Sequence, residues 1–141
     1  VQAGVTDFDM LGFSYYFNYF LTNPHLNNMD GISATIRHIE STYGKPVIIV
    51  EAAYYWSKVD ATGYVIPITP FNGYSFDPSG QLQFMRDFTQ AVINGGGVGV
   101  QYWAPDYLNN PWGGEMEDRA LFDFYGHALP ALKFMSSSYS F

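Results

Sequence analysis

The sequence predicts an α/β fold with a parallel sheet, in which this chain forms part of a larger α/β barrel. Short apolar runs alternate with amphipathic helical patterns, and three strand-like runs recur at wide intervals along 141 residues. Eight units at that interval need roughly 300 residues, which is within the usual size of an eight-stranded barrel. A small, complete three-layer α/β domain is the alternative.

The three expected strands share one pattern. They lie within Phe8–Tyr16, Pro46–Tyr55 and Val98–Tyr107, and each begins with a short apolar run and ends in aromatic and polar residues. Near-continuous apolar runs of this length are typical of parallel strands that are covered on both faces.

Two amphipathic helices are expected between the strands. Apolar residues recur every three or four positions in Met29–Tyr43 and Ser79–Asn94. Asn28 or Asp30 provides a cap for the first helix, and the glycines at 95–97 end the second.

The remaining segments are expected to be mostly loops. Ser57–Pro78 has no helical period and contains several glycines and prolines. It follows the second strand, so we expect it at the carboxyl-terminal edge of the sheet, where α/β proteins place their sites. A last helix is expected near Leu129–Met135. Three acidic residues are expected to be solvated charges, and these are Glu115, Glu117 and Asp118.

Composition excludes several classes of protein. Hydrophobic residues make up 48% of the chain and charged residues 13%, which excludes a disordered chain. No apolar run reaches the ~20 residues of a membrane helix. With 13 acidic and 6 basic residues the net charge is −7, so we expect no nucleic-acid partner. There is no cysteine, and no secretion signal pattern is visible.

Glu51 is the main candidate for chemistry. It follows the apolar run Val47–Val50, and a carboxylate in that position is costly to bury without a partner. At the carboxyl end of a barrel strand it points into the mouth of the barrel, where it can act as a nucleophile or a general base. The alternative is a structural glutamate that pairs with an arginine inside the barrel.

Aromatic residues make up 19% of the chain and gather where the expected strands end. Rings that converge around one acid indicate a sugar-binding cleft, because an aromatic face packs on a sugar ring. Strand alternation requires that some of these rings pack behind the sheet, and a tyrosine-rich core or an oligomer interface is the alternative. The candidate substrate-binding residues are Tyr15, Tyr16, Tyr54, Trp56, Trp103 and Asp106.

Other catalytic classes lack their motifs. The three histidines show no metal-binding spacing, and no serine lies in a GxSxG motif. The glycine run at 95–99 precedes a strand, whereas a phosphate-binding loop follows one. We therefore predict neither a metal site nor a cofactor.

Five separated motifs resemble the arabinogalactan endo-β-1,4-galactanase family, which are retaining glycoside hydrolases on a (β/α)8 barrel. They are DFDMLGFSYY at 7–16, YGKP leading into VIIVEAAYYW at 43–56, SGQ at 79–81, GVGVQYWAPDYL at 97–108 and ALFDFYGHALPAL at 120–132. The resemblance implies that residues 1–141 are the C-terminal portion of one catalytic domain, with strands six to eight and no second domain.

The resemblance also implies roles for single residues. Glu51 matches the nucleophile at the end of the seventh strand, while the acid/base glutamate belongs to the fourth strand, outside this chain. Tyr15 and Tyr16 match the tyrosines of the sixth strand, and Trp103 matches the tryptophan under the cleaved bond. Ala104 replaces an acidic residue of the family, which affects the expected substrate specificity.

The resemblance further implies an endo-acting enzyme that cleaves β-1,4-galactan outside the cell. The chain by itself is then expected to be inactive, because its partner is the missing N-terminal part of the barrel. Some family members bind calcium, but the loop after Trp56 offers Asp60 without a His/Asn series, so we predict no calcium site. A non-catalytic carbohydrate-binding or assembly module is the alternative function.

Overall fold

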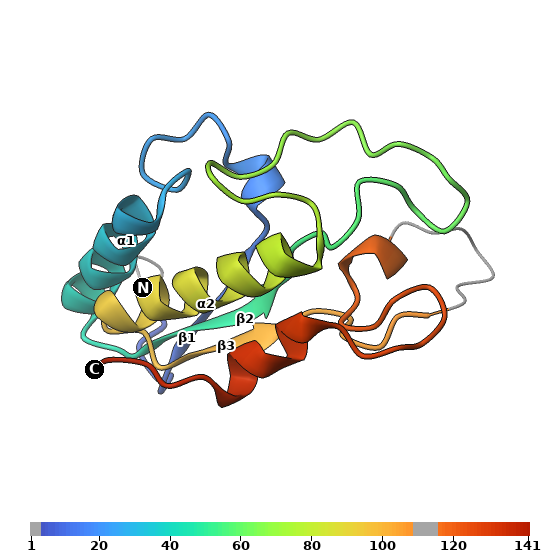
Figure 1. The fold of residues 1–141 in the computed structure, drawn as a ribbon. Helices are drawn as coiled ribbons and strands as arrows, with labels where there is room; N and C mark the ends of the chain where they lie inside the picture. The colour runs from blue at the N-terminus through green and yellow to red at the C-terminus, as the bar shows by residue number, and fades with distance from the viewer. Residues whose placement is uncertain (1–3, 109–115) are drawn as a thin grey trace.

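The computed structural model describes residues 4–108 and 116–141. Three strands form one parallel sheet in the order β1-β2-β3. The helices α1 and α2 lie side by side on one face of it (Figure 1). The elements in chain order are β1 (Leu11–Tyr15), η1 (Phe17–Tyr19), α1 (Met29–Tyr43), β2 (Val47–Ala52), α2 (Pro78–Asn94), β3 (Gly99–Tyr102), η2 (Glu117–Arg119) and η3 (Pro130–Ser136), where η marks a 3-10 helix.

Local signals place the helices correctly. Helix α1 has the predicted bounds, and its cap is Asn28, whose side chain accepts a hydrogen bond from the Gly31 N–H at 2.8 Å. The helix ends at Gly44, whose φ of 61° suits a residue without a Cβ. Helix α2 starts at Pro78, one residue earlier than expected, with Asp77 as its cap.

The core lies between the sheet and the helices. Val47 and Ile49 of β2 are buried against apolar residues of α1 and α2. On the opposite face Gly12, Ser14 and Val50 are exposed, and in Figure 1 no described helix covers that face. The described residues thus form two layers and not the three-layer alternative. None of the described helices is long and apolar enough to cross a membrane.

One expectation for the C-terminal part is confirmed and one is wrong. The last helix, expected near Leu129–Met135, is present as a 3-10 helix at Pro130–Ser136. Glu117 and Asp118 are 5% and 2% exposed, so they are buried and not solvated. Their backbone carbonyls are bonded to other parts of the chain, which holds the segment inward. Glu115 lies outside the described residues.

Candidate active site

A β-bulge in β2 aims the Glu51 side chain. Val47 and Ile49 face the helices, so simple alternation directs Glu51 to the same side. In the structure Ile49 pairs with Phe13, but Ser14 pairs with Glu51, so β2 holds one extra residue at this point. The pairing with β3 shifts in the same interval. The extra residue turns Glu51 to the open face of the sheet, as bulges near active sites commonly do.

Two hydroxyl groups hold the Glu51 carboxylate. Ser14 Oγ and Tyr16 Oη donate hydrogen bonds to Glu51 Oε2, at 2.9 and 3.2 Å. Among the described residues no arginine or lysine forms an ion pair with it, so the alternative of a structural, arginine-paired glutamate is not observed. Both bonds reach the same oxygen, which leaves Oε1 of this half-buried side chain for a reacting atom.

Tyr16 is suited to remain a hydrogen-bond donor. Burial of the phenol, together with the negative charge of the neighbouring Glu51, raises the pKa of Tyr16 to about 12. The hydroxyl therefore stays protonated at neutral pH, and its hydrogen bond to the carboxylate is charge-assisted.

Trp103 and Asp106 follow β3 and are accessible. The Trp103 N–H donates to the carbonyl of Ala52 at 2.9 Å, and 45% of this residue is exposed. The next residue, Ala104, has a φ of +51°, a left-handed conformation that is uncommon without a glycine. Such strain is frequent at functional sites. Asp106 is exposed.

Trp56 lies four residues after the end of β2 and is partly buried. Its indole N–H donates to the carbonyl of Glu117 at 2.8 Å, and its ring packs on Phe124 with the centroids 4.5 Å apart. The residue as a whole is partly exposed.

Tyr15 and Tyr54 do not belong to the accessible site, contrary to the sequence-based expectation. They are 5% and 0% exposed and lie in the core on the helix side of the sheet. Tyr15 donates its hydroxyl to the carbonyl of Leu26 at 2.7 Å, and the ring of Tyr54 stacks on Phe84. Tyr15 follows Ser14, whose side chain lies on the open face beside Glu51, so alternation places the Tyr15 ring behind the sheet.

The sequence reasoning missed two contributors to the site. Ser14 lies in no GxSxG motif and was not predicted to take part, although its position opposite Glu51 makes it a hydrogen-bond donor. Arg119 places its guanidinium 4.7 Å from the ring centroid of Tyr55 and 3.4 Å from Asp118. Ser14 lies inside the DFDMLGFSYY motif, but no sequence pattern indicates the Ser14–Glu51 or Arg119–Tyr55 contact, because each joins segments far apart in the sequence.

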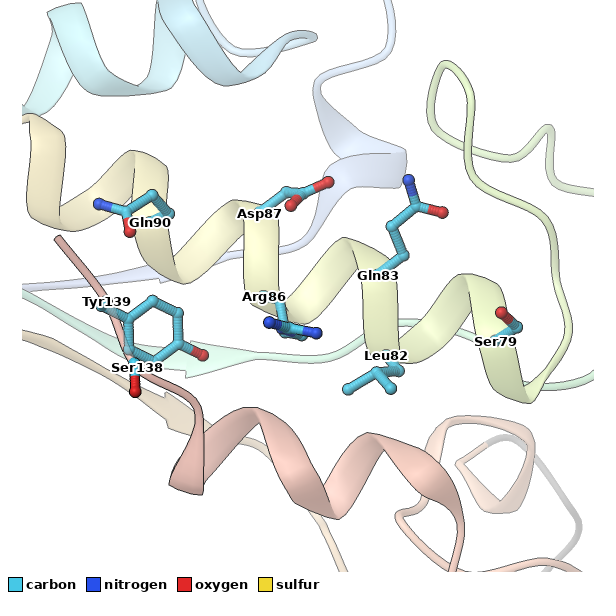
Figure 2. A pocket seen from close by; sticks show the side chains of 8 residues that line it. All are labelled: Ser79, Leu82, Gln83, Arg86, Asp87, Gln90, Ser138 and Tyr139. Atoms are coloured by element: carbon cyan, nitrogen blue, oxygen red, sulfur yellow. The ribbon is translucent and has the colours of Figure 1, made fainter.

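A groove on the outer layer is separate from this site. It has a volume of about 360 Å³ and lies between α2 and the C-terminal segment (Figure 2). Its lining includes Arg86, Asp87 and Tyr139, with no residue from the strand ends. In residues 4–108 and 116–141, no group of three or more His, Asp or Glu side chains is arranged to hold a metal ion.

Comparison with known proteins identifies the family of this chain. Residues 1–135 match the model of glycosyl hydrolase family 53. The chain belongs to glycosyl hydrolase family 53. This membership confirms the resemblance that the five sequence motifs indicated.

Among the relatives is the arabinogalactan endo-β-1,4-galactanase of Cellvibrio japonicus. It is 33% identical over 153 aligned residues, which cover 98% of this chain and 38% of the relative. The chain thus spans about two fifths of the length of that curated relative.

Solved structures of the family confirm the predicted fold class. The GH53 catalytic domain of Ignisphaera aggregans superposes with a TM-score of 0.80 and 29% identity, over 99% of this chain and 41% of that domain. A fungal β-1,4-galactanase structure gives a TM-score of 0.71 at 25% identity, over 94% of this chain and 39% of the other. The parallel sheet and its helices are the C-terminal part of a (β/α)8 barrel.

Proposed function

We propose that this chain is the C-terminal portion of an endo-acting glycoside hydrolase that cleaves β-1,4-galactan with retention of configuration. The observation that carries the proposal is Glu51, a carboxylate held by two hydroxyls on the open face of a family 53 sheet. The relatives' names support the choice of glycan.

In the proposed reaction Glu51 attacks the anomeric carbon of the bound sugar through Oε1. The bonds from Ser14 and Tyr16 fix the rotamer of the carboxylate, which keeps the attacking oxygen aligned. The bond from the anomeric carbon to the leaving oxygen breaks as a glycosyl-enzyme ester forms, and water later cleaves that ester.

A second carboxyl group must protonate the leaving oxygen. In retaining enzymes it lies about 5–5.5 Å from the nucleophile. Among the described residues, the hydrogen-bond partners of Glu51 are hydroxyl groups and not a second acid. We therefore assign the acid/base to the part of the barrel outside this chain, and we expect the 141 residues alone to be inactive.

The wall of the cleft is assigned to Tyr16, Trp56, Trp103 and Asp106. The rings of the first three offer apolar faces for pyranose rings, and Asp106 can accept hydrogen bonds from sugar hydroxyls. A polymeric substrate does not enter a cell, so an extracellular location follows from the same proposal. We assign no cofactor to this part of the site.

The test uses the full-length hydrolase with β-1,4-galactan. Glu51→Ala is expected to abolish turnover and to recover part of it with azide, which replaces the carboxylate as nucleophile and gives the α-glycosyl azide. Glu51→Gln is expected to keep sugar affinity while losing activity. Asp87→Asn, which changes a carboxylate on the outer face of α2, is the matched control and is expected to be fully active.

Two results would contradict the proposal. Undiminished hydrolysis by Glu51→Gln removes this residue from the mechanism. Binding of galactan by a parent protein that never hydrolyses it favours the alternative of a non-catalytic carbohydrate-binding module.

A further inference from the structure

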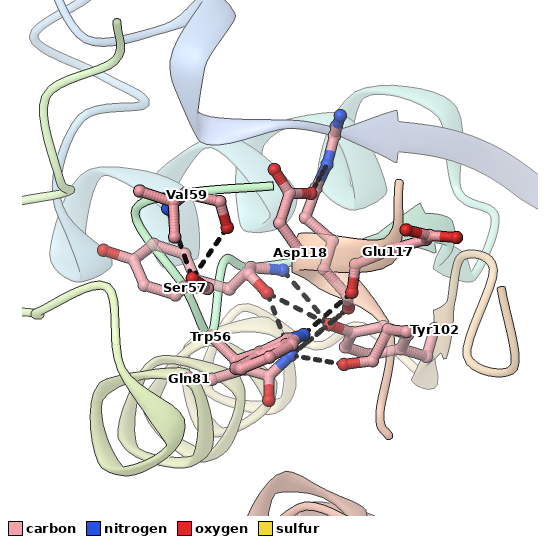
Figure 3. Close-up of polar contacts among 10 residues, drawn as sticks. Trp56, Ser57, Val59, Gln81, Tyr102, Glu117 and Asp118 are labelled. Atoms are coloured by element: carbon pink, nitrogen blue, oxygen red, sulfur yellow. Dashed lines mark hydrogen bonds and ion pairs between the residues drawn. The ribbon is translucent and has the colours of Figure 1, made fainter. Parts of the chain in front are cut away.

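Four consecutive carbonyl groups, from Glu117 to Ala120, accept hydrogen bonds from other parts of the chain. Figure 3 shows the surroundings of Glu117 and Asp118, with Trp56, Gln81 and Tyr102 nearby. Trp56 supplies two of the donors, its indole N–H to Glu117 and its backbone N–H to Asp118, both at 2.8 Å. The Tyr102 hydroxyl donates to Arg119 at 2.6 Å, and the Gln81 amide donates to Ala120 at 3.0 Å. Segment 117–120 is thereby tied to the ends of two strands and to α2.

The Gln81 amide and the Tyr102 hydroxyl supply the polar protons at the centre of this arrangement. The amide nitrogen of Gln81 lies 3.0 Å from the Tyr54 carbonyl, 3.2 Å from the Arg119 carbonyl and 3.0 Å from the Ala120 carbonyl. The same nitrogen lies 3.0 Å from the Tyr102 hydroxyl oxygen, and that hydroxyl lies 3.2 Å from the Tyr54 carbonyl. The two amide protons and the one hydroxyl proton are therefore shared among the three carbonyls and the hydroxyl oxygen. The Tyr102 oxygen in turn accepts from the Tyr54 N–H at 3.3 Å.

The orientation of the Gln81 side chain is set by its donors. Gln81 is fully buried, and its Oε1 has no partner among the described residues. Turning the amide over would place Oε1 against three carbonyl oxygens, which repel it. The hydrogen bonds that the amide N–H groups donate to carbonyls therefore contribute more than the unpaired, buried Oε1 costs.

The tied segment borders the candidate active site. Tyr54 lies three residues after Glu51, so the Gln81 amide holds the chain directly beyond the nucleophile. Arg119 stacks over the ring of Tyr55, so fixing its carbonyl also fixes that stack. Displacement of this segment would move Trp56 as well, through its two hydrogen bonds.

We propose that Gln81 is a positioning residue for glycan binding: its buried amide locks segment 117–120 to the ends of β2 and β3 and so fixes the cleft wall beside Glu51. The proposal rests on the proposed function, because it concerns the same site. Gln81 touches no substrate and acts through the carbonyls it binds.

The test compares variants of the full-length hydrolase on β-1,4-galactan. Gln81→Leu is expected to lower kcat/KM at least about tenfold, the scale of one lost buried hydrogen bond. Most of the change is expected as a rise in KM, since the wall binds the glycan. Gln83→Leu, which removes an exposed amide from the same helix, is the matched control and is expected to leave KM unchanged.

Gln81→Glu adds a readout that depends on pH. A protonated carboxyl group at this position can donate one hydrogen bond, and an ionised one can donate none. Burial keeps the introduced carboxyl protonated to an unusually high pH. The ratio of kcat/KM between Gln81→Glu and the parent is therefore expected to fall as pH rises, whereas the ratio for Gln81→Leu stays flat.

The outcomes separate the possible failures. A merely structural role lowers kcat through the loss of folded enzyme and leaves KM at the parent value, which would overturn the proposal. If Gln81→Leu does not fold, Tyr102→Phe decides, because it removes one of the three protons at nearly constant shape. An unchanged KM in that variant also overturns it. A parent without activity on galactan refutes the proposed function itself.

Discussion

Asp118 makes stability depend on pH in an unusual direction. Its side chain is 3% exposed, and burial raises the pKa of Asp118 to about 7, although the adjacent guanidinium of Arg119 opposes the shift. In the unfolded chain the same carboxyl group ionises near its ordinary pKa of 3.8. Between these values the folded state binds more protons than the unfolded state.

The sign and size of the effect follow from linkage. Because the folded pKa is the higher one, this group's contribution to stability is complete below about pH 4 and is lost as pH rises to about 7. A difference of roughly three units corresponds to at most about 4 kcal/mol of unfolding free energy. Asp118→Asn replaces the carboxyl group by a neutral amide of similar shape, which removes this dependence.

The assay is denaturant unfolding of the full-length protein at pH 5 and at pH 8. Relative to the parent, Asp118→Asn is expected to gain stability as pH rises, by up to about 3 kcal/mol between pH 5 and pH 8. Asp9→Asn, which changes an exposed aspartate near β1, is the control and is expected to follow the parent. A difference between Asp118→Asn and the parent that is constant with pH, or that shrinks as pH rises, would refute this reasoning.

Two further substitutions test the fold and the site. Gly80→Ala places a Cβ 2.1 Å from the backbone oxygen of Ser75, so we expect severe destabilisation in thermal unfolding; a normal melting temperature would contradict the packing described at the start of α2. Ser14→Ala removes the shorter hydrogen bond to Glu51 and is expected to lower kcat by about tenfold at unchanged stability, measured on galactan. Unchanged kcat would show that Tyr16 alone suffices to hold the carboxylate.

Local physics explains what the sequence predicted well. Caps, glycine stops and a 3.6-residue period act within a few positions, so both long helices were located to within one residue. Glu51 was identified because a carboxylate after an apolar run needs a partner. Its direction was not predictable, because the bulge in β2 depends on pairing with strands elsewhere in the chain.

The choice among aromatic residues failed for a related reason. Alternation says that Tyr15 and Tyr16 face opposite sides, but the sequence does not say which of them faces the helices. The burial of Gln81 was also not predictable, because the carbonyls that surround it come from segments 27 to 39 positions away. Contacts of that kind leave no periodic pattern.

Helices α1 and α2 cover only one face of the sheet, and this has a consequence for the order in which such a barrel assembles. Each parallel crossover here is closed by its own helix, so the core behind β2 can form from neighbouring stretches of chain at a modest loop-closure entropy. Within the described residues the opposite surface leaves Val50 and Trp103 exposed, and the outer edges of β1 and β3 pair with no further strand. Under the proposed function, strands from the rest of the barrel would pair with those edges. A folding intermediate that stops at this stage would therefore expose apolar side chains and strand edges, and would be prone to aggregate with other chains.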